Sequence, residues 1–148
     1  MEGHFATRVL SADPDAVAPD GSEVRLLCSL AGGSMAHFRL PAGACSAAVV
    51  HRTVGELWFV VAGEGELWRS REGIAETVAL RPGVSVSIPV GTSFQFRASP
   101  ASEVAVVGVT MPPWPGDEEA VGMLGTWDAQ AGATSSPTRT TPGSTTVA

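Results

Sequence analysis

An apolar stretch bounded by glycines near the middle of the chain constrains the fold more than any other feature. Residues 57–62 are apolar, β-branched or aromatic, residues 63–65 read Gly-Glu-Gly, and residues 66–69 read Glu-Leu-Trp-Arg, as expected of a returning strand. Segments of this kind on either side of a glycine turn are typical of a buried β-hairpin. The sequence therefore predicts two antiparallel strands within residues 56–70.

The alternation of the first strand places a carboxyl group among apolar side chains. Glu56 and Trp58 share one face of a regular strand, and the other face carries Leu57, Phe59 and Val61. A buried carboxylate is costly unless it is paired, protonated or bound to a cation. Glu56 is therefore the first candidate for a functional side chain.

Short segments of similar character, separated by Gly- and Pro-containing turns, flank this hairpin on both sides. The expected strands are residues 23–28, 34–40, 46–52, 76–80, 84–88, 93–98 and 103–110. The sequence shows no amphipathic helix and no internal repeat. Many short strands with turns between them favour an all-β fold, a closed jelly roll or barrel in one domain.

The chain divides into four parts by composition. Residues 1–22 contain Asp-Pro and Pro-Asp-Gly turn signals and are expected to be irregular, and residues 23–110 are expected to form the β-barrel. Residues 111–130 are too rich in proline for a central strand and are expected to cover the barrel. Ser, Thr, Pro and Gly dominate residues 131–148, so we expect a disordered tail there.

The covering segment has two interpretations. Trp114 is expected to anchor it by packing, and the acidic residues 117–119 are expected to be solvated. The alternative is that Trp114 and the acidic residues together form a lid over the barrel mouth and touch a ligand. The sequence leaves both open.

Charge and cysteine usage limit the partners and the compartment. The net charge is −6, and all nine basic residues are arginine. This balance argues against nucleic acid and against an anionic membrane as partners. No secretory signal or membrane-spanning stretch is evident, and Cys28 and Cys45 lack metal-finger or redox spacing, so we expect free thiols in the cytoplasm.

Two motifs carry a resemblance to a known family. In the first, His51 is separated by four residues from Glu56, and six residues separate Glu56 from Gly63. This spacing resembles the first motif of the cupin superfamily, His-x-His, three or four residues, Glu, six residues, Gly. Val49 stands where cupins have the first histidine.

The second motif follows in the expected order. Gly83, Pro89 and Gly91 match the cupin spacing Gly, five residues, Pro-x-Gly, but Phe94 stands at the histidine position and Ala98 at the asparagine position. The resemblance covers residues 34–110 and implies a small single-domain cupin, a jelly-roll β-barrel, with a degenerate metal-binding motif. It also implies a homodimer, because cupins commonly pair through an outer sheet.

The candidate site centres on His51 and Glu56, which we predict to be its catalytic residues. We expect further side chains to line the pocket: His37, Val49, Trp58, Phe94 and Phe96. His37 would also be a replacement metal ligand if its strand neighboured that of His51.

Three interpretations of the pair stay open. His51 and Glu56 could hold one divalent ion, Fe, Mn, Zn or Ni, although two of the four ligands typical of cupins are missing. A site without a cofactor is equally well supported, and in that case the pair would transfer protons in a poorly solvated pocket. The two residues could also be a structural hydrogen-bonded pair.

The leading functional prediction is a small-molecule enzyme of metabolism, secondary pathways included, with isomerase-, cyclase- or lyase-type acid–base chemistry and with metal optional. The main alternative is a non-enzymatic cupin that binds or senses a small ligand. A metal-dependent dioxygenase is the third, because such enzymes need the ligands that this chain lacks.

Overall fold

A computed structural model of the chain describes residues 4–129. These residues form β-strands and one short 3₁₀ helix, η1 (Asp117–Glu119), and no α-helix occurs among them. The prediction of an all-β fold is therefore confirmed. The expected disordered tail, residues 131–148, lies outside the described residues. Within the described range, no helix has the length and apolar character needed to cross a bilayer.

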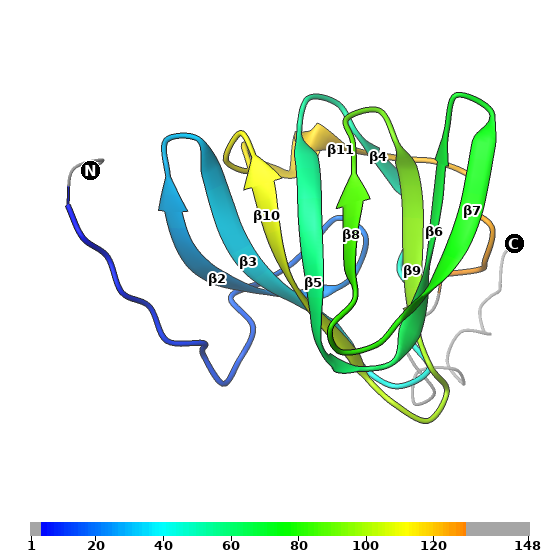
Figure 1. Cartoon of the computed structure of the whole chain (residues 1–148), viewed down its shortest axis with the longest axis horizontal. Coiled ribbons are helices and arrows are strands. Elements are labelled where there is room, and N and C mark those ends of the chain that lie inside the picture. The colour runs from blue at the N-terminus through cyan, green and yellow to red at the C-terminus, as the bar shows by residue number, and fades with distance from the viewer. Residues whose placement is uncertain (1–3, 130–148) are drawn as a thin grey trace, which may run out of the picture.

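The strands form two antiparallel sheets that face each other around an apolar interior (Figure 1). The first sheet consists of β1 (Ala16–Val17), β2 (Glu23–Leu30), β3 (Gly33–Leu40), β10 (Val104–Met111), β5 (Gly55–Gly63) and β8 (Ser85–Ile88), in that spatial order. The second sheet consists of β11 (Ala120–Gly122), β4 (Val49–His51), β9 (Ser93–Ala98), β6 (Gly65–Arg71) and β7 (Ile74–Leu80).

The pairing of strands is nested around the hairpin of β6 and β7. Strand β6 pairs with β7, β5 with β8, β4 with β9 and β3 with β10. Pairs therefore alternate between the two sheets as the chain runs outward from the hairpin. This is the wrapping of a jelly roll, and it confirms the predicted class of barrel.

Strand β5 has the predicted alternation of faces. Glu56 and Trp58 are 5% and 3% exposed, whereas Leu57 and Phe59 are 51% and 50% exposed. The glycine at the end of this strand is required, because Gly63 has a φ of +73° and a Cβ there would collide with the carbonyl of Glu103. The hairpin predicted from the sequence is therefore present, with its buried face turned toward the barrel interior.

The strand predicted for residues 46–52 is shorter than expected. Only Val49–His51 are in β4. The Ala47 N–H donates to the carbonyl of Asp20, and the Ala48 carbonyl accepts from the Met123 N–H, so these backbone groups bond to segments outside the sheet. Competing hydrogen bonds to the N-terminal and C-terminal segments explain the difference.

One end of the barrel interior is filled with apolar side chains. Leu67, Phe96 and Val104 are fully buried, and Leu80 is 1% exposed. Val104 pairs with Gly63 at one end of the β10–β5 ladder, whereas Thr110 pairs with Glu56 near its other end. We call the first the closed end and the second, where Glu56 lies, the open end.

The covering segment crosses the open end, and two side-chain contacts hold it in addition to the pairing of β11 with β4 and the hydrogen bond from the Trp114 N–H to Ser34 Oγ. Glu119 accepts hydrogen bonds from the backbone N–H groups of Thr53 and Val54. Further along, the buried amide of Gln95 accepts from the N–H groups of Thr126 and Trp127 and donates to the Trp127 carbonyl. Both contacts join the segment to the second sheet or to the loop after β4, so they fix its path over the barrel.

Candidate functional site

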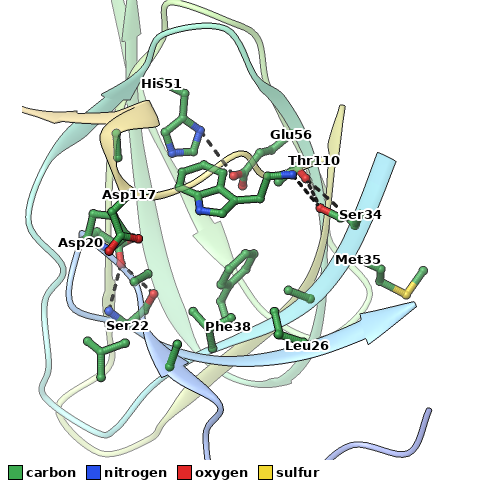
Figure 2. Close-up of a pocket in the computed structure, with 18 of the residues that line it drawn as sticks. Asp20, Ser22, Leu26, Ser34, Met35, Phe38, His51, Glu56, Thr110 and Asp117 are labelled. Carbon is green, nitrogen blue, oxygen red and sulfur yellow. Dashed lines mark hydrogen bonds and ion pairs between the residues drawn. The ribbon is translucent and has the colours of Figure 1, made fainter. Parts of the chain in front are cut away.

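Two strands from opposite sheets bring His51 and Glu56 together at the open end. Glu56 lies near the start of β5, and His51 ends β4, where it pairs with Ala120 of β11. Their side chains are 4% and 7% exposed, and His51 Nδ1 lies 3.4 Å from Glu56 Oε2 (Figure 2). The structure therefore unites the two residues that the sequence singled out.

The pair faces a cavity of about 450 Å³ that opens at this end of the barrel. Most of its wall is apolar, and the aromatic side chains in it are Phe38, Trp58, Phe94 and Trp114. Its polar lining includes His51, Glu56, Thr110, Ser34, Ser22, Asp20, Asp117 and Arg8. A cavity of this size with a few polar groups in an apolar wall is typical of small-molecule sites.

Burial controls the protonation of Glu56. It raises the pKa of this carboxyl from 4.5 to about 7, with a hydrogen bond from Trp58 opposing the shift and the nearby carboxyl of Asp20 adding to it. Glu56 Oε1 accepts from Trp58 Nε1 at 2.6 Å. Within residues 4–129, no hydrogen bond reaches Oε2. One oxygen of Glu56 thus fixes the carboxyl group, and the other is free to interact with a ligand.

Burial acts on His51 in the opposite direction. It lowers the pKa of the imidazole to about 4, against the charge of Glu119, which raises it. The ring packs against Phe94 and Trp114, with centroids 5.0 and 4.9 Å away, and Nδ1 is buried with no hydrogen bond inside the described part of the chain. His51 is therefore neutral near pH 7, and its contact with Glu56 is not an ion pair there.

Glu119, whose charge acts on His51, is itself held in the ionised form. Burial raises the pKa of Glu119, but hydrogen bonds from Thr53 and Val54 outweigh that effect and hold the pKa below 4.5. The carboxylate accepts from both backbone N–H groups and from Thr53 Oγ1. Because donors already occupy its oxygens, the Glu119 carboxylate is not available to a ligand in the cavity. Its role is to hold the covering segment next to His51.

A glycine behind the aromatic wall sets where two of the rings lie. A Cβ on Gly108 of β10 would lie 2.7 Å from the Phe38 ring and 3.0 Å from the Trp58 ring. Both rings line the cavity, and their centroids are 6.1 Å apart. The missing side chain at position 108 therefore lets both rings pack close to β10.

Comparison with known proteins gives matches at the level of structure. No family model and no curated protein matches the sequence. KdgF from Halomonas sp. superposes with a TM-score of 0.61 at 18% identity, covering 74% of this chain and 97% of KdgF. The Drosophila melanogaster CENP-C cupin domain superposes with a TM-score of 0.55 at 15% identity, covering 62% of this chain and 66% of the other.

A deletion mutant of the Bacillus subtilis oxalate decarboxylase OxdC superposes with a TM-score of 0.62 at 14% identity. The match covers 75% of this chain and 30% of the decarboxylase. The chain has the cupin fold. Identities this low establish the architecture and leave the chemistry to be argued from the residues of this chain.

The residues of this chain do not fit a metal site with three or more protein ligands. Val49 and Phe94, which stand at two of the histidine positions of the motif, line the cavity as apolar side chains. Among residues 4–129, no group of three or more His, Cys, Asp or Glu side chains is arranged to hold an ion. A catalytic zinc site normally has three protein ligands, and His51 with Glu56 supplies two.

Two predicted pocket residues lie elsewhere. His37 is in β3 of the first sheet and is not among the residues that line the cavity with His51. It lies between two cavity-lining residues of the strand, Ala36 and Phe38, and the pleat turns it to the opposite face. Phe96 is fully buried beneath the cavity, with its ring centroid 4.9 Å from that of Trp58. The remaining predicted pocket residues, Val49, Trp58 and Phe94, line the cavity.

Several lining residues were not predicted from the sequence. Phe38 could have been found, because it alternates with Ser34 and Ala36 along one strand. Asp20 and Asp117 could not, because they come from an irregular segment and from η1, whose positions depend on tertiary contacts. Trp114, for which the sequence left two roles open, lines the cavity and contacts His51.

Proposed function

We propose that this cupin binds a small organic molecule in the open-end cavity and transfers a proton on it without a metal, using Glu56 as the acid–base group. The observation that carries the proposal is the pair of buried side chains, His51 and Glu56, 3.4 Å apart on the wall of a cavity of about 450 Å³. Isomerisation, cyclisation and elimination all fit, since each removes a proton from one atom of the substrate and delivers one elsewhere.

The electrostatics of the pair support this chemistry. A carboxyl group with a pKa of about 7 populates both its acid and its base form near neutrality. The neutral imidazole of His51 can accept a hydrogen bond from the protonated carboxyl of Glu56 at Nδ1, or donate one to the carboxylate in the other tautomer, after a small approach from 3.4 Å. The hydrogen bond from Trp58 Nε1 fixes the carboxyl group in the orientation that such a transfer needs.

Deuterium incorporation tests the proposal directly. The metal-free protein, dialysed against a chelator, is incubated in D₂O with a panel of small carbonyl and hydroxy compounds, and exchange at carbon is followed by NMR. We expect at least one compound to exchange, and the Glu56→Gln protein to be slower by about 100-fold or more. Glu66→Gln is the matched control, because Glu66 pairs with Arg97 away from the cavity. Exchange that survives in Glu56→Gln, or that requires added metal, would contradict the proposal.

A ligand-binding role without turnover is the second candidate. It is favoured by the hydrogen bond between Trp58 and Glu56, which occupies one carboxyl oxygen and suits a static recognition site as well as a catalytic one. Binding of a compound by calorimetry, with no exchange or conversion of any compound bound, would select this candidate over the first.

We further propose that the protein is a cytoplasmic homodimer. Leu57, Phe59 and Val61 are 43–51% exposed on the outer face of β5, and an adjoining groove is lined by Val107 and Val109 of β10. An apolar sheet face of this kind is a common site of protein association. Cys28 and Cys45 are free thiols, which suits a reducing compartment.

A further inference from the structure

The four aromatic side chains in the cavity wall are arranged to contact one ligand from several sides. The Trp58 and Phe94 rings meet edge to face, with an interplanar angle of 88° and centroids 5.9 Å apart. Phe38 also packs near Trp58, with centroids 6.1 Å apart and the rings tilted by 37°. Rings that meet at such angles form corners rather than stacks, so a single occupant of the cavity can contact more than one ring.

The titratable groups that share this wall are mainly acidic. Three carboxyl groups line the cavity, those of Glu56, Asp20 and Asp117, against one guanidinium, that of Arg8. Neither aspartate forms an ion pair with any residue in the described range. In the view of Figure 2, Asp20 and Asp117 lie on one side of the cavity and Glu56 on the other. The carboxyl groups of the two aspartates therefore come from a different part of the cavity wall than that of Glu56.

Glu56 supplies an independent indication of what that occupant is. Its side chain is only 4% exposed, it lines the cavity, and its Oε2 accepts no hydrogen bond within the described residues. A buried carboxyl oxygen normally has a donor or a cation as its partner. Besides the contact at 3.4 Å with His51 Nδ1, this oxygen has room for a positively charged or hydrogen-bond-donating group of a ligand.

We propose that the ligand of this cavity is a small organic cation, a substituted ammonium, held by the aromatic wall and the three carboxyl groups. A cation over an aromatic face is attracted by the quadrupole of the ring, most strongly when water is excluded. A cavity of about 450 Å³ has room for an ammonium group with several carbon substituents. The inference rests on the proposed binding role of the cavity and not on the proton transfer.

A pair of ligands that differ only in charge tests the proposal. Choline and 3,3-dimethylbutan-1-ol have the same shape, with nitrogen in the first replaced by carbon in the second. Binding of each to the full chain is measured by calorimetry at pH 7.5, and phenyltrimethylammonium serves as a larger cation. We expect choline to bind at least about tenfold more tightly than its neutral isostere, a difference of about 1.4 kcal/mol.

Three variants locate the source of that preference. Glu56→Gln keeps the shape of the side chain and removes its charge, so we expect the preference for choline to fall to within about threefold while affinity for the neutral isostere is unchanged. Asp117→Asn should reduce the preference less, because its side chain is more exposed. Glu118→Gln is the matched control, since it removes the same charge one residue along without lining the cavity, and its preference should equal that of the unmodified chain.

Equal affinity for choline and the isostere would overturn the proposal and indicate a neutral ligand. So would binding of neither cation below 10 mM, or a Glu118→Gln effect as large as that of Asp117→Asn, which would indicate general charge steering. Circular dichroism of each variant confirms that it is folded. Because binding and deuterium exchange are separate measurements, a protein that prefers choline but exchanges no proton would retain this inference and lose the catalytic one.

Discussion

The two ends of the barrel interior are built from the same strands and differ in what fills them. At the closed end, Leu67, Phe96 and Val104 occupy the space between the sheets completely. At the open end, Glu56 and His51 face a cavity of about 450 Å³. Strand β5 runs from one to the other, from Glu56 pairing with Thr110 to Gly63 pairing with Val104. The difference separates the residues that hold the fold from those available for chemistry.

This division has a physical basis. A filled apolar end gains the full free energy of burial and carries no unsatisfied polar group. The open end gives up part of that packing and keeps a carboxyl and an imidazole away from water, at a cost that shifts both pKa values. Substitutions at the closed end are therefore expected to lower stability, and substitutions at the open end to change the pH dependence of stability and the chemistry of the site.

The largest effect is expected at the closed end. Phe96→Ala removes a fully buried ring that contacts Trp58, and we expect the free energy of unfolding to fall by about 3–5 kcal/mol in urea titration. Trp114→Ala, at the mouth of the cavity where the side chain is half-buried, should cost much less. Similar losses at both positions would remove the distinction between the ends.

Removing Glu56 or His51 at the open end should change how the stability of the protein depends on pH. The pKa of Glu56 is raised to about 7, so its contribution to stability is present below pH 4.5 and is lost as the pH rises through 7. The pKa of His51 is lowered to about 4, so its contribution is present above pH 6.5 and is lost as the pH falls through 4. Between pH 4.5 and 6.5 the two slopes oppose each other.

The melting temperature of Glu56→Gln, measured by calorimetry against the unmodified chain, should therefore rise with pH across this window, and that of His51→Gln should fall. Each effect is on the order of 3 kcal/mol at its full extent. The double variant should lack both slopes. Slopes of the same sign in the two single variants would show that the groups do not have opposite shifts.

The attachment of the cover should be weakened by a change at its C-terminal contact. Gln95→Leu keeps the approximate volume but leaves the N–H groups of Thr126 and Trp127 without their acceptor, which is expected to cost about 1–3 kcal/mol. Limited proteolysis should then cut within residues 112–128 faster than in the unmodified chain, while cleavage within β5 to β8 stays the same. Uniformly faster cleavage would mean that Gln95 supports the whole barrel.

The smallest effect on folding is expected on the outer face of β5. Leu57→Glu changes a side chain that is 51% exposed, so unfolding of the monomer should change by about 0.5 kcal/mol or less. If the proposed dimer uses this face, sedimentation analysis should show the variant dissociating where the unmodified chain does not. Glu72→Gln, in the exposed turn between β6 and β7, is the control. An unchanged assembly state would place any dimer contact elsewhere.

The sequence was most informative where local pattern determines structure. The alternation from Glu56 along β5 and the glycine at position 63 depend on the pleat and on one turn, and both were predicted correctly. The pairing of His51 with Glu56 followed from the spacing of the cupin motif. His37 could not be placed, because its distance from His51 depends on strand order, which local pattern does not contain. Asp20 reached the cavity through hydrogen bonds of an irregular segment, for which the sequence holds no periodic signal.

Gly108 gives the cavity a property that none of its lining residues has. It contributes no side chain to the wall, yet the Phe38 and Trp58 rings lie where they do only because no methyl group projects from β10 at that point. An alanine at position 108 would push both rings off the strand and into the space that a ligand would occupy. A single added methyl group at position 108, which would touch no ligand itself, can therefore restrict the range of ligands that fit in the cavity.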